Sequence, residues 1–206
     1  MMSEKSQRST NLKMLRLAGV CGILGSILPL VVVLSATFLS SWFSWNTNAL
    51  SEMGVGEQAA LFNSAVLIGG ALNFLFALGL RNNLDEGKLT QAGVVSIMVS
   101  SVSLALVGIF TIDYLLLHGI AAFGYFMLAP AGFLLIGLGT KERTIRKLSF
   151  ACGIAALFAI LILPVLILAL SLRIGFAVPE LVESLVISVW TLPMSARLLA
   201  VNRVIA

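Results

Sequence analysis

Six long apolar stretches, separated by short polar connections, make up most of this 206-residue chain. Each stretch is long enough for a helix to cross the hydrocarbon core of a bilayer, which takes about 20 residues. We therefore expect an all-α protein, a polytopic membrane bundle of six transmembrane helices in a single domain over residues 1–206. The expected spans are Leu15–Phe38, Ala60–Leu80, Ala92–Thr111, Ile120–Leu138, Ser149–Leu172 and Leu181–Val201.

The composition favours the same class of protein. Hydrophobic residues make up 59% of the chain and charged residues only 11%, too few charges to cover a soluble domain of this size. The net charge is +4, but the basic residues are spread over short loops beside the spans, where they orient the chain and contact lipid head groups. We therefore expect membrane lipids, and no nucleic acid, as partners.

The distribution of Lys and Arg predicts the topology. Twelve of the thirteen lie on one side of the six-span pattern, and only Arg173 lies on the other. By the positive-inside rule both termini are cytoplasmic, so residues 1–14 form a cytoplasmic tail and residues 40–58 an extracytoplasmic loop of a multi-pass cell-membrane protein. The outward-facing connections hold five of the nine acids, namely Glu52, Glu57, Asp113, Glu180 and Glu183.

Small residues recur at every fourth position in the first two spans, a spacing that lets helix backbones approach closely in lipid. A compact bundle accounts for these stripes, and a homodimer built on one of them or a larger membrane complex stays open. The stripes are Ala18, Gly22 and Ser26 in the first span, and Ala65, Gly69, Asn73 and Ala77 in the second.

Four of the five prolines lie inside spans, so four of the six helices are expected to bend or break. Such kinks often border cavities, and transporters place ligands at discontinuous helices. The four are Pro29, Pro130, Pro164 and Pro193.

The first outer loop has apolar residues embedded among polar ones. Between Asn48 and Gly56 these residues favour a segment that folds back as a lid over the bundle, with glycines supplying the turns. We expect Leu50 and Met53 to pack into the mouth of the bundle, and Asn63 to hydrogen-bond the loop backbone, because an unpaired amide in lipid costs on the order of a few kcal/mol.

His118, the only histidine, lies in the third connection, and mutual pairing is the least costly arrangement for ionisable groups near the membrane core. We expect Asp113, His118 and Glu183 to converge into an outward-facing polar pocket, and with Glu52 they are chemically suited to a zinc ion or a harder cation. The alternative is a histidine that caps an outer turn and bonds a carboxylate for stability alone. The pocket candidates are Asn48, Ser51, Glu52, Asn63, Asp113, His118, Glu183 and Trp190.

Counting residues excludes several familiar functions. One histidine cannot ligate two membrane haems or build a His-rich zinc hydrolase site, and no GxxxxGK[ST] phosphate loop or GxSxG motif occurs. We therefore expect neither haem nor nucleotide as a cofactor. Ser51 is the only outer-loop serine that we consider as a nucleophile.

The function that we favour is binding or transport of a small ligand, a cation or a lipid head group in the outer pocket. One alternative is an enzyme acting on membrane lipids, with His118 as general base oriented by Glu183 or Asp113; another is an accessory subunit of a larger complex. The inner halves of the spans hold no acid or base, which counts against a proton path. Lipid head group candidates on the inner side are Lys141, Arg143, Arg146 and Lys147.

The chain resembles a bacterial and archaeal family of six-helix membrane proteins, known as domain of unknown function nine hundred and ninety-eight. The resemblance spans nearly the whole chain and implies the six-helix fold and an outward polar site, without an activity. The residues that carry it are Asn48–Gly56 running into Leu61, Phe62 and Asn63, then Gly108, Ile109 and Phe110 ahead of Asp113 and His118, then Glu183 ahead of Trp190.

The charge asymmetry predicts the outcome of cysteine labelling in intact cells. Thr47→Cys should react with a membrane-impermeant maleimide from outside, and Thr144→Cys should react only after permeabilisation, because the loops that contain them lie on opposite sides. The opposite pattern of labelling would overturn every assignment of side.

Overall fold

The computed structural model describes residues 4–84 and 87–201, and in this part of the chain it contains helices and no strand. Six helical segments are long and apolar enough to cross a membrane, so the expected six-span architecture is confirmed. Arg203 and residues 1–3 of the predicted tail lie outside the described residues. The elements are α1 (Glu4–Leu39), η1 (Leu50–Gly54), α2 (Ala59–Arg81), α3 (Lys88–Ile109), η2 (Ile112–Tyr114), α4 (Leu115–Gly139), α5 (Arg143–Leu157), η3 (Phe158–Ile162), α6 (Leu163–Ala169) and α7 (Ala177–Ala200).

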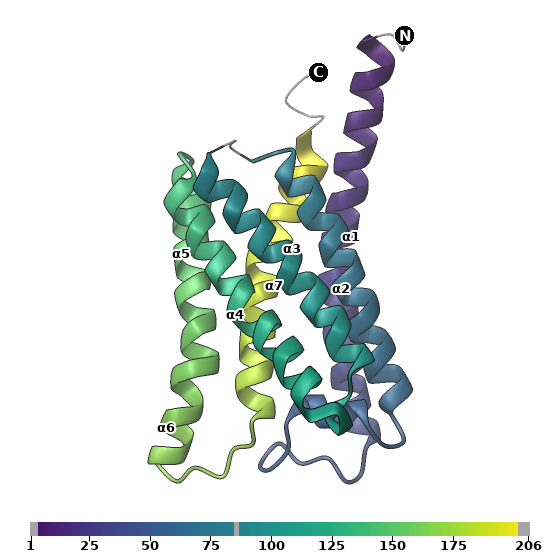
Figure 1. The fold of residues 1–206 in the computed structure, drawn as a ribbon, viewed down its shortest axis with the longest axis vertical. Coiled ribbons are helices and arrows are strands. Elements are labelled where there is room, and N and C mark those ends of the chain that lie inside the picture. The colour runs from purple at the N-terminus through teal and green to yellow at the C-terminus, as the bar shows by residue number, and fades with distance from the viewer. Residues whose placement is uncertain (1–3, 85–86, 202–206) are drawn as a thin grey trace.

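The spans form a closed ring. Each of α1 to α4 packs against the next helix along the chain, and α7 packs against both α5 and α1. Figure 1 shows that α1 begins and α7 ends at one end of the bundle, here called the terminal end, whereas residues 40–58 lie at the opposite end, here called the loop end. The start of α1 and the end of α7 thus lie at the same end of the bundle, and the assignment of that end to the cytoplasmic side of a membrane stays a prediction.

Helix α1 is longer than the bilayer requires. Its 36 residues span about 54 Å at 1.5 Å per residue, against a hydrocarbon core of about 30 Å. Figure 1 shows the excess projecting beyond the other helices at the terminal end. Residues 4–14 of the predicted tail are thus a helical extension of the first span.

The small-residue stripes of the first two spans face each other inside the bundle. A Cβ atom at Gly25 would lie 2.9 Å from Oδ1 of Asn73, and one at Gly69 would collide with the ring of Pro29. The side-chain amide of Asn73 also donates a hydrogen bond of 3.1 Å to the Gly25 carbonyl. In the first stripe, Ala18 faces Gly79 and Gly22 faces Phe76, so members of both stripes lie in the contact between α1 and α2.

The fifth span changes its helical geometry immediately before a proline. Residues Phe158–Ile162 form the π-helical turn η3, in which the Leu163 amide bonds the Phe158 carbonyl, and Pro164 starts the short helix α6. Pro164 has no N–H to continue the ladder, which explains the local change of pitch. The expected interruption is found here, whereas α1, α4 and α7 continue as helices through Pro29, Pro130 and Pro193.

An aromatic cluster fills the terminal half of the ring. The Trp190 indole stacks on Phe133 with ring centroids 4.3 Å apart, and Phe76 meets it edge-on at 6.5 Å. The indole N–H donates a 2.9 Å hydrogen bond to the Ser149 hydroxyl, so its polar atom is satisfied. All three rings are buried, and together they close the centre of the bundle.

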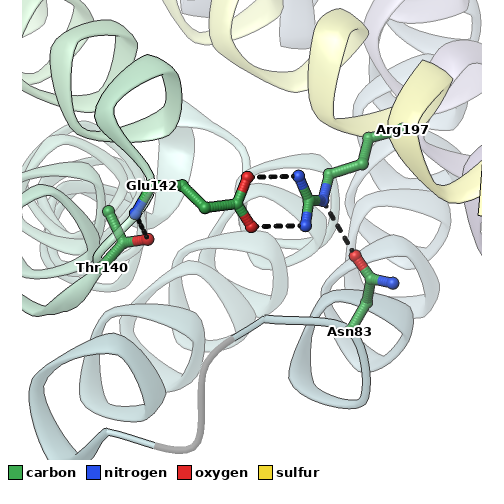
Figure 2. Close-up of polar contacts among 4 residues, drawn as sticks. All are labelled: Asn83, Thr140, Glu142 and Arg197. Atoms are coloured by element: carbon green, nitrogen blue, oxygen red, sulfur yellow. Dashed lines mark hydrogen bonds and ion pairs between the residues drawn. The ribbon is translucent and has the colours of Figure 1, made fainter.

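Arg197 joins three segments of the chain at the terminal end (Figure 2). Its guanidinium makes a two-pronged ion pair with Glu142, with both N–O distances 2.6 Å, and donates a third hydrogen bond to Oδ1 of Asn83 at 3.1 Å. The Glu142 amide is in turn bonded to the Thr140 hydroxyl. Both charged groups are partly exposed, so the pair orients the connections after α2 and α4 and contributes only modestly to stability.

The contact between α2 and α3 has no room for an added side chain. A Cβ atom at Gly70 would lie 2.5 Å from the Ala105 amide nitrogen, so Gly70→Ala must push two backbones apart. We expect it to destabilise the folded state by roughly 1–3 kcal/mol, measured as a lower midpoint of thermal unfolding in detergent micelles. Gly119→Ala is the matched control, because nothing lies within 4 Å of its added Cβ, and it should leave the midpoint unchanged or raise it.

Candidate functional site

Residues 40–58 fold back over the loop end of the bundle, as their apolar residues predict. Leu50 and Met53 belong to the 3₁₀ helix η1 and are 7% and 0% exposed. They pack with Val33, Ala36 and Phe62 in a cluster that is separate from the aromatic one. The expected packing of Leu50 and Met53 into the mouth of the bundle is therefore confirmed.

Side chains within the loop and from α2 hold the backbone of this segment. The Asn63 amide donates a 2.9 Å hydrogen bond to the Gly54 carbonyl, as expected. Glu52 accepts hydrogen bonds from the Asn48 side chain at 2.6 Å and from the Ala49 amide at 2.9 Å. Gly56 has a φ of 88°, a conformation in which a side chain would be strained. Asn48 and Glu52, both candidates for ligand contacts, thus have structural partners in the loop.

Glu180 fixes the start of η1 from the far end of the sequence. Its carboxylate accepts the Leu50 amide at 2.5 Å and also bonds the amide and hydroxyl of Ser51. Glu180 is only 6% exposed, so it satisfies backbone donors that would otherwise be buried without acceptors. From the sequence, Glu180 is only one of the acids of the outward-facing connections, because no local pattern links it to a loop 130 residues earlier.

The connection between α6 and α7 completes the attachment of the loop. The Gly175 amide bonds the Trp45 carbonyl at 2.7 Å, and the Ala177 amide bonds the Asn48 carbonyl at 2.9 Å. A Cβ atom at residue 175 would lie 2.5 Å from the Asn48 carbonyl oxygen. Glycine is required here because two backbones meet without intervening side chains.

A cavity of about 90 Å³ lies beneath η1, inside the ring. Leu50, Ser51 and Glu180 line it at the loop end, and Asn73 lines it one turn before the aromatic cluster. Along α7 the lining runs from Glu180 to Ser188, about 12 Å at the helical rise, so the cavity is elongated along the helices. Its walls are mainly apolar, and the described polar groups that line it are Ser26, Ser51, Asn73, Tyr125, Glu180, Ser184 and Ser188.

One side of the cavity, between α4 and α7, is lined by half-buried residues. On α2 and α3 the lining residues Phe62, Val66 and Val107 are buried, whereas Tyr125 on α4 and Ser184 on α7 are only half-buried. These two helices make little contact. In the terminal half α5 lies between them, and α6 packs mainly on η3. A hydrogen bond between the Tyr125 and Ser184 side chains bridges α4 and α7 at this opening.

The structure does not bring together the three residues expected to form the polar pocket. His118 is 6% exposed and its Nδ1 is bonded to the Phe110 carbonyl at 2.8 Å, Asp113 is exposed, and Glu183 is fully buried within the bundle. His118 makes no ion pair with a carboxylate in the described part of the chain, and among those residues no three His, Cys, Asp or Glu side chains are grouped to hold a metal ion. His118 thus links the start of α4 to the end of α3, as a capping histidine does.

Glu183 and Trp190 lie on a different face of α7 from the cavity lining. Trp190 belongs to the aromatic cluster. Both carboxyl oxygens of Glu183 are buried and have no hydrogen-bond partner. The Tyr125 phenol, which lines the cavity, interacts with this carboxyl electrostatically.

The four basic candidates for lipid head groups lie around the start of α5, at the terminal end. Their side chains are exposed, and Arg146 also donates a 2.7 Å hydrogen bond to the Thr140 carbonyl. Lipid binding by this cluster stays a prediction. The four are Lys141, Arg143, Arg146 and Lys147.

The lid prediction follows from the bonds of Glu180. Glu180→Ala leaves the Leu50 and Ser51 amides without their acceptor, at about 1–3 kcal/mol for each buried donor. We expect amide hydrogen exchange of residues 49–55 to accelerate by about tenfold or more, since ~1.4 kcal/mol is a factor of ten. Glu57→Ala, an exposed acid in the same loop, should leave the exchange unchanged; equal exchange in the two variants would contradict this role for Glu180.

Comparison with known proteins supports the resemblance seen in the sequence. The model of one family, described as a protein of unknown function (DUF998), matches residues 23–197, from the first span to the last turns of α7. No curated protein and no solved structure matches the chain. The match covers the ring of six helices, η1 and the cavity lining, and the chain is therefore a member of the DUF998 family of multi-pass membrane proteins.

Proposed function

We propose that this protein binds a small amphipathic molecule in the cavity beneath η1, with an apolar chain between the helices and a polar group near the loop end. The observation that carries this proposal is the elongated, mainly apolar cavity with a few polar groups. Such a lining is typical of ligand sites in proteins. On the topology expected from the charges, the polar group of the ligand faces outward.

The size of the cavity supports a thin ligand. Its volume is about 90 Å³, whereas an apolar cavity of roughly 150 Å³ admits a benzene ring. A single alkyl chain matches the length along α7, and the walls would have to move apart for more than a few of its carbons to enter. We expect the head group of the ligand to be neutral or positive. An anionic head group would be repelled by the Glu180 carboxylate at this end of the cavity.

Asn73 supports a polar contact at the far end of the cavity. Its Oδ1 atom is buried without a hydrogen-bond partner, although its amide nitrogen bonds Gly25. A hydroxyl or amine on the ligand would supply the missing donor, and buried polar atoms in native proteins are nearly always paired.

Two features favour binding over transport. The aromatic cluster of Phe76, Phe133 and Trp190 fills the ring between the cavity and the terminal end. The side of the cavity that is lined by half-buried residues lies between α4 and α7, which would face lipid. The ligand would therefore enter from the bilayer and leave by the same side.

A lipid-modifying enzyme with His118 as general base has less support. The Nδ1 atom of His118 is engaged by the Phe110 carbonyl, and its side chain does not line the cavity. The same holds for a metal site built on Asp113, His118 and Glu183, because their side chains are not grouped. If this protein is an accessory subunit of a larger complex, it would bind the ligand in the same cavity.

Photolabelling tests this function in nanodiscs. A dodecanol that carries a diazirine at its chain end should label peptides from Leu30–Leu34 and Leu181–Ile187, which line the cavity. Ala122→Phe would fill the cavity between α4 and α7, and we expect it to reduce this labelling about tenfold, equivalent to ~1.4 kcal/mol. Ala155→Phe makes the same change at an exposed position of α5 and should not affect it.

Dodecylamine and dodecanoic acid probes define the head group. The amine should compete with the alcohol probe, and the acid should compete least, because of its charge. Labelling spread evenly over exposed residues such as those of α6, and unchanged in Ala122→Phe, would overturn the proposal.

A further inference from the structure

Glu183 is a fully buried acid that neither the ring packing nor the cavity uses. Its exposed fraction is 0%, and both carboxyl oxygens lack a hydrogen-bond partner. The other buried acid of the helix, Glu180, differs in having three donors from η1. An ionisable side chain in the membrane-spanning part of a protein is costly and is usually functional. Packing alone therefore does not explain why an acid occupies this buried position.

The charged form of Glu183 has no compensation in its surroundings. On α4 the titratable residue that faces it is Tyr125, and on α7 Glu180 lies one turn away. The turn η3, which packs against α7, contains only apolar residues. The described basic residues form no ion pair with Glu183. A carboxylate ion isolated in this way would be very unfavourable, whereas a neutral carboxyl group or one with a bound cation would not.

A short polar path joins Glu183 to the cavity. Tyr125 is close enough to the Glu183 carboxyl for an electrostatic interaction and is hydrogen-bonded to the Ser184 side chain. Both Tyr125 and Ser184 line the cavity and are half-buried at the opening between α4 and α7. A small movement of the Glu183 or Tyr125 side chain would be needed to bring the acid into hydrogen-bond contact with the tyrosine hydroxyl.

We infer that Glu183 is a proton-binding site within the membrane, which exchanges its proton with the cavity through Tyr125 and Ser184. In each exchange the carboxyl proton moves to the tyrosine oxygen, the tyrosine proton to the Ser184 oxygen and the serine proton to a water molecule in the cavity, and the reverse transfers return a proton to the carboxyl, so Glu183 ends neutral. The inference holds for the protein without ligand and does not depend on the proposed amphipathic molecule.

Infrared spectroscopy of the protein in nanodiscs tests the site directly. The wild-type protein should show the C=O stretch of a neutral carboxylic acid at neutral pH, and the band should shift on transfer to D₂O as the carboxyl proton exchanges. Glu183→Gln should remove this band. Glu180→Gln, one turn away on the same helix, should retain it, and Tyr125→Phe should slow the shift because the path to the cavity is interrupted.

Carbodiimide labelling gives a second measurement on the wild-type protein, in case Glu183→Gln fails to fold. The undissociated acid adds across one C=N bond of dicyclohexylcarbodiimide, and its proton moves to nitrogen, leaving a stable N-acylurea after rearrangement. Mass spectrometry should find the adduct on the peptide that contains Glu183, with less adduct as the pH is raised. An absent acid band, a band insensitive to D₂O, or an adduct only on exposed acids such as Glu57 would overturn the inference. None of these results bears on ligand photolabelling.

Discussion

The hydrogen bonds between Glu180 and the start of η1 are the interaction on which the loop end of the molecule depends. A loop that folds against an apolar bundle must bury backbone donors, and each donor left without an acceptor costs about 1–3 kcal/mol. Glu180 supplies acceptors to Leu50 and Ser51 from the first turn of α7. Without this carboxylate, η1 would not stay closed over the cavity, although Leu50 and Met53 would still favour contact with the bundle.

The two halves of the ring differ in packing: the terminal half is filled by side chains, and the loop half contains the cavity. In the terminal half, Phe76, Phe133 and Trp190 pack as a solid core, and Arg197 ties Glu142 to Asn83 at its edge. In the loop half, α4 and α7 separate because α6 diverges after the π-helical turn before Pro164. The cavity lies in this half, so the least packed part of the bundle is also the part that contains the buried acids Glu180 and Glu183.

The same residue types therefore have different roles according to their partners. Glu180 is a structural acid, since its oxygens are occupied by donors of η1. Glu183, three residues later, has no hydrogen-bond donor for either carboxyl oxygen. His118 has the chemistry of a general base, yet its contact with Phe110 makes it a link between α3 and α4. Chemical identity alone did not distinguish these cases.

The sequence by itself determined the six spans and the return of the loop to the bundle. The length of an apolar stretch determines whether it can cross a bilayer, so the spans could be predicted from neighbouring residues. The return of the loop could be predicted in the same way, because the pattern around Leu50, Met53 and Asn63 is local. The boundaries were less accurate: the sixth span begins at Ala177, because Pro179 lies in its first turn. Only the tertiary structure decided that Glu180 holds Leu50, that Asp113 and His118 lie apart from Glu183, and that α7 closes the ring between α5 and α1. These contacts join residues far apart in the chain. They depend on how each helix is rotated about its own axis, and that rotation is determined by packing against all of the helix's neighbours at once.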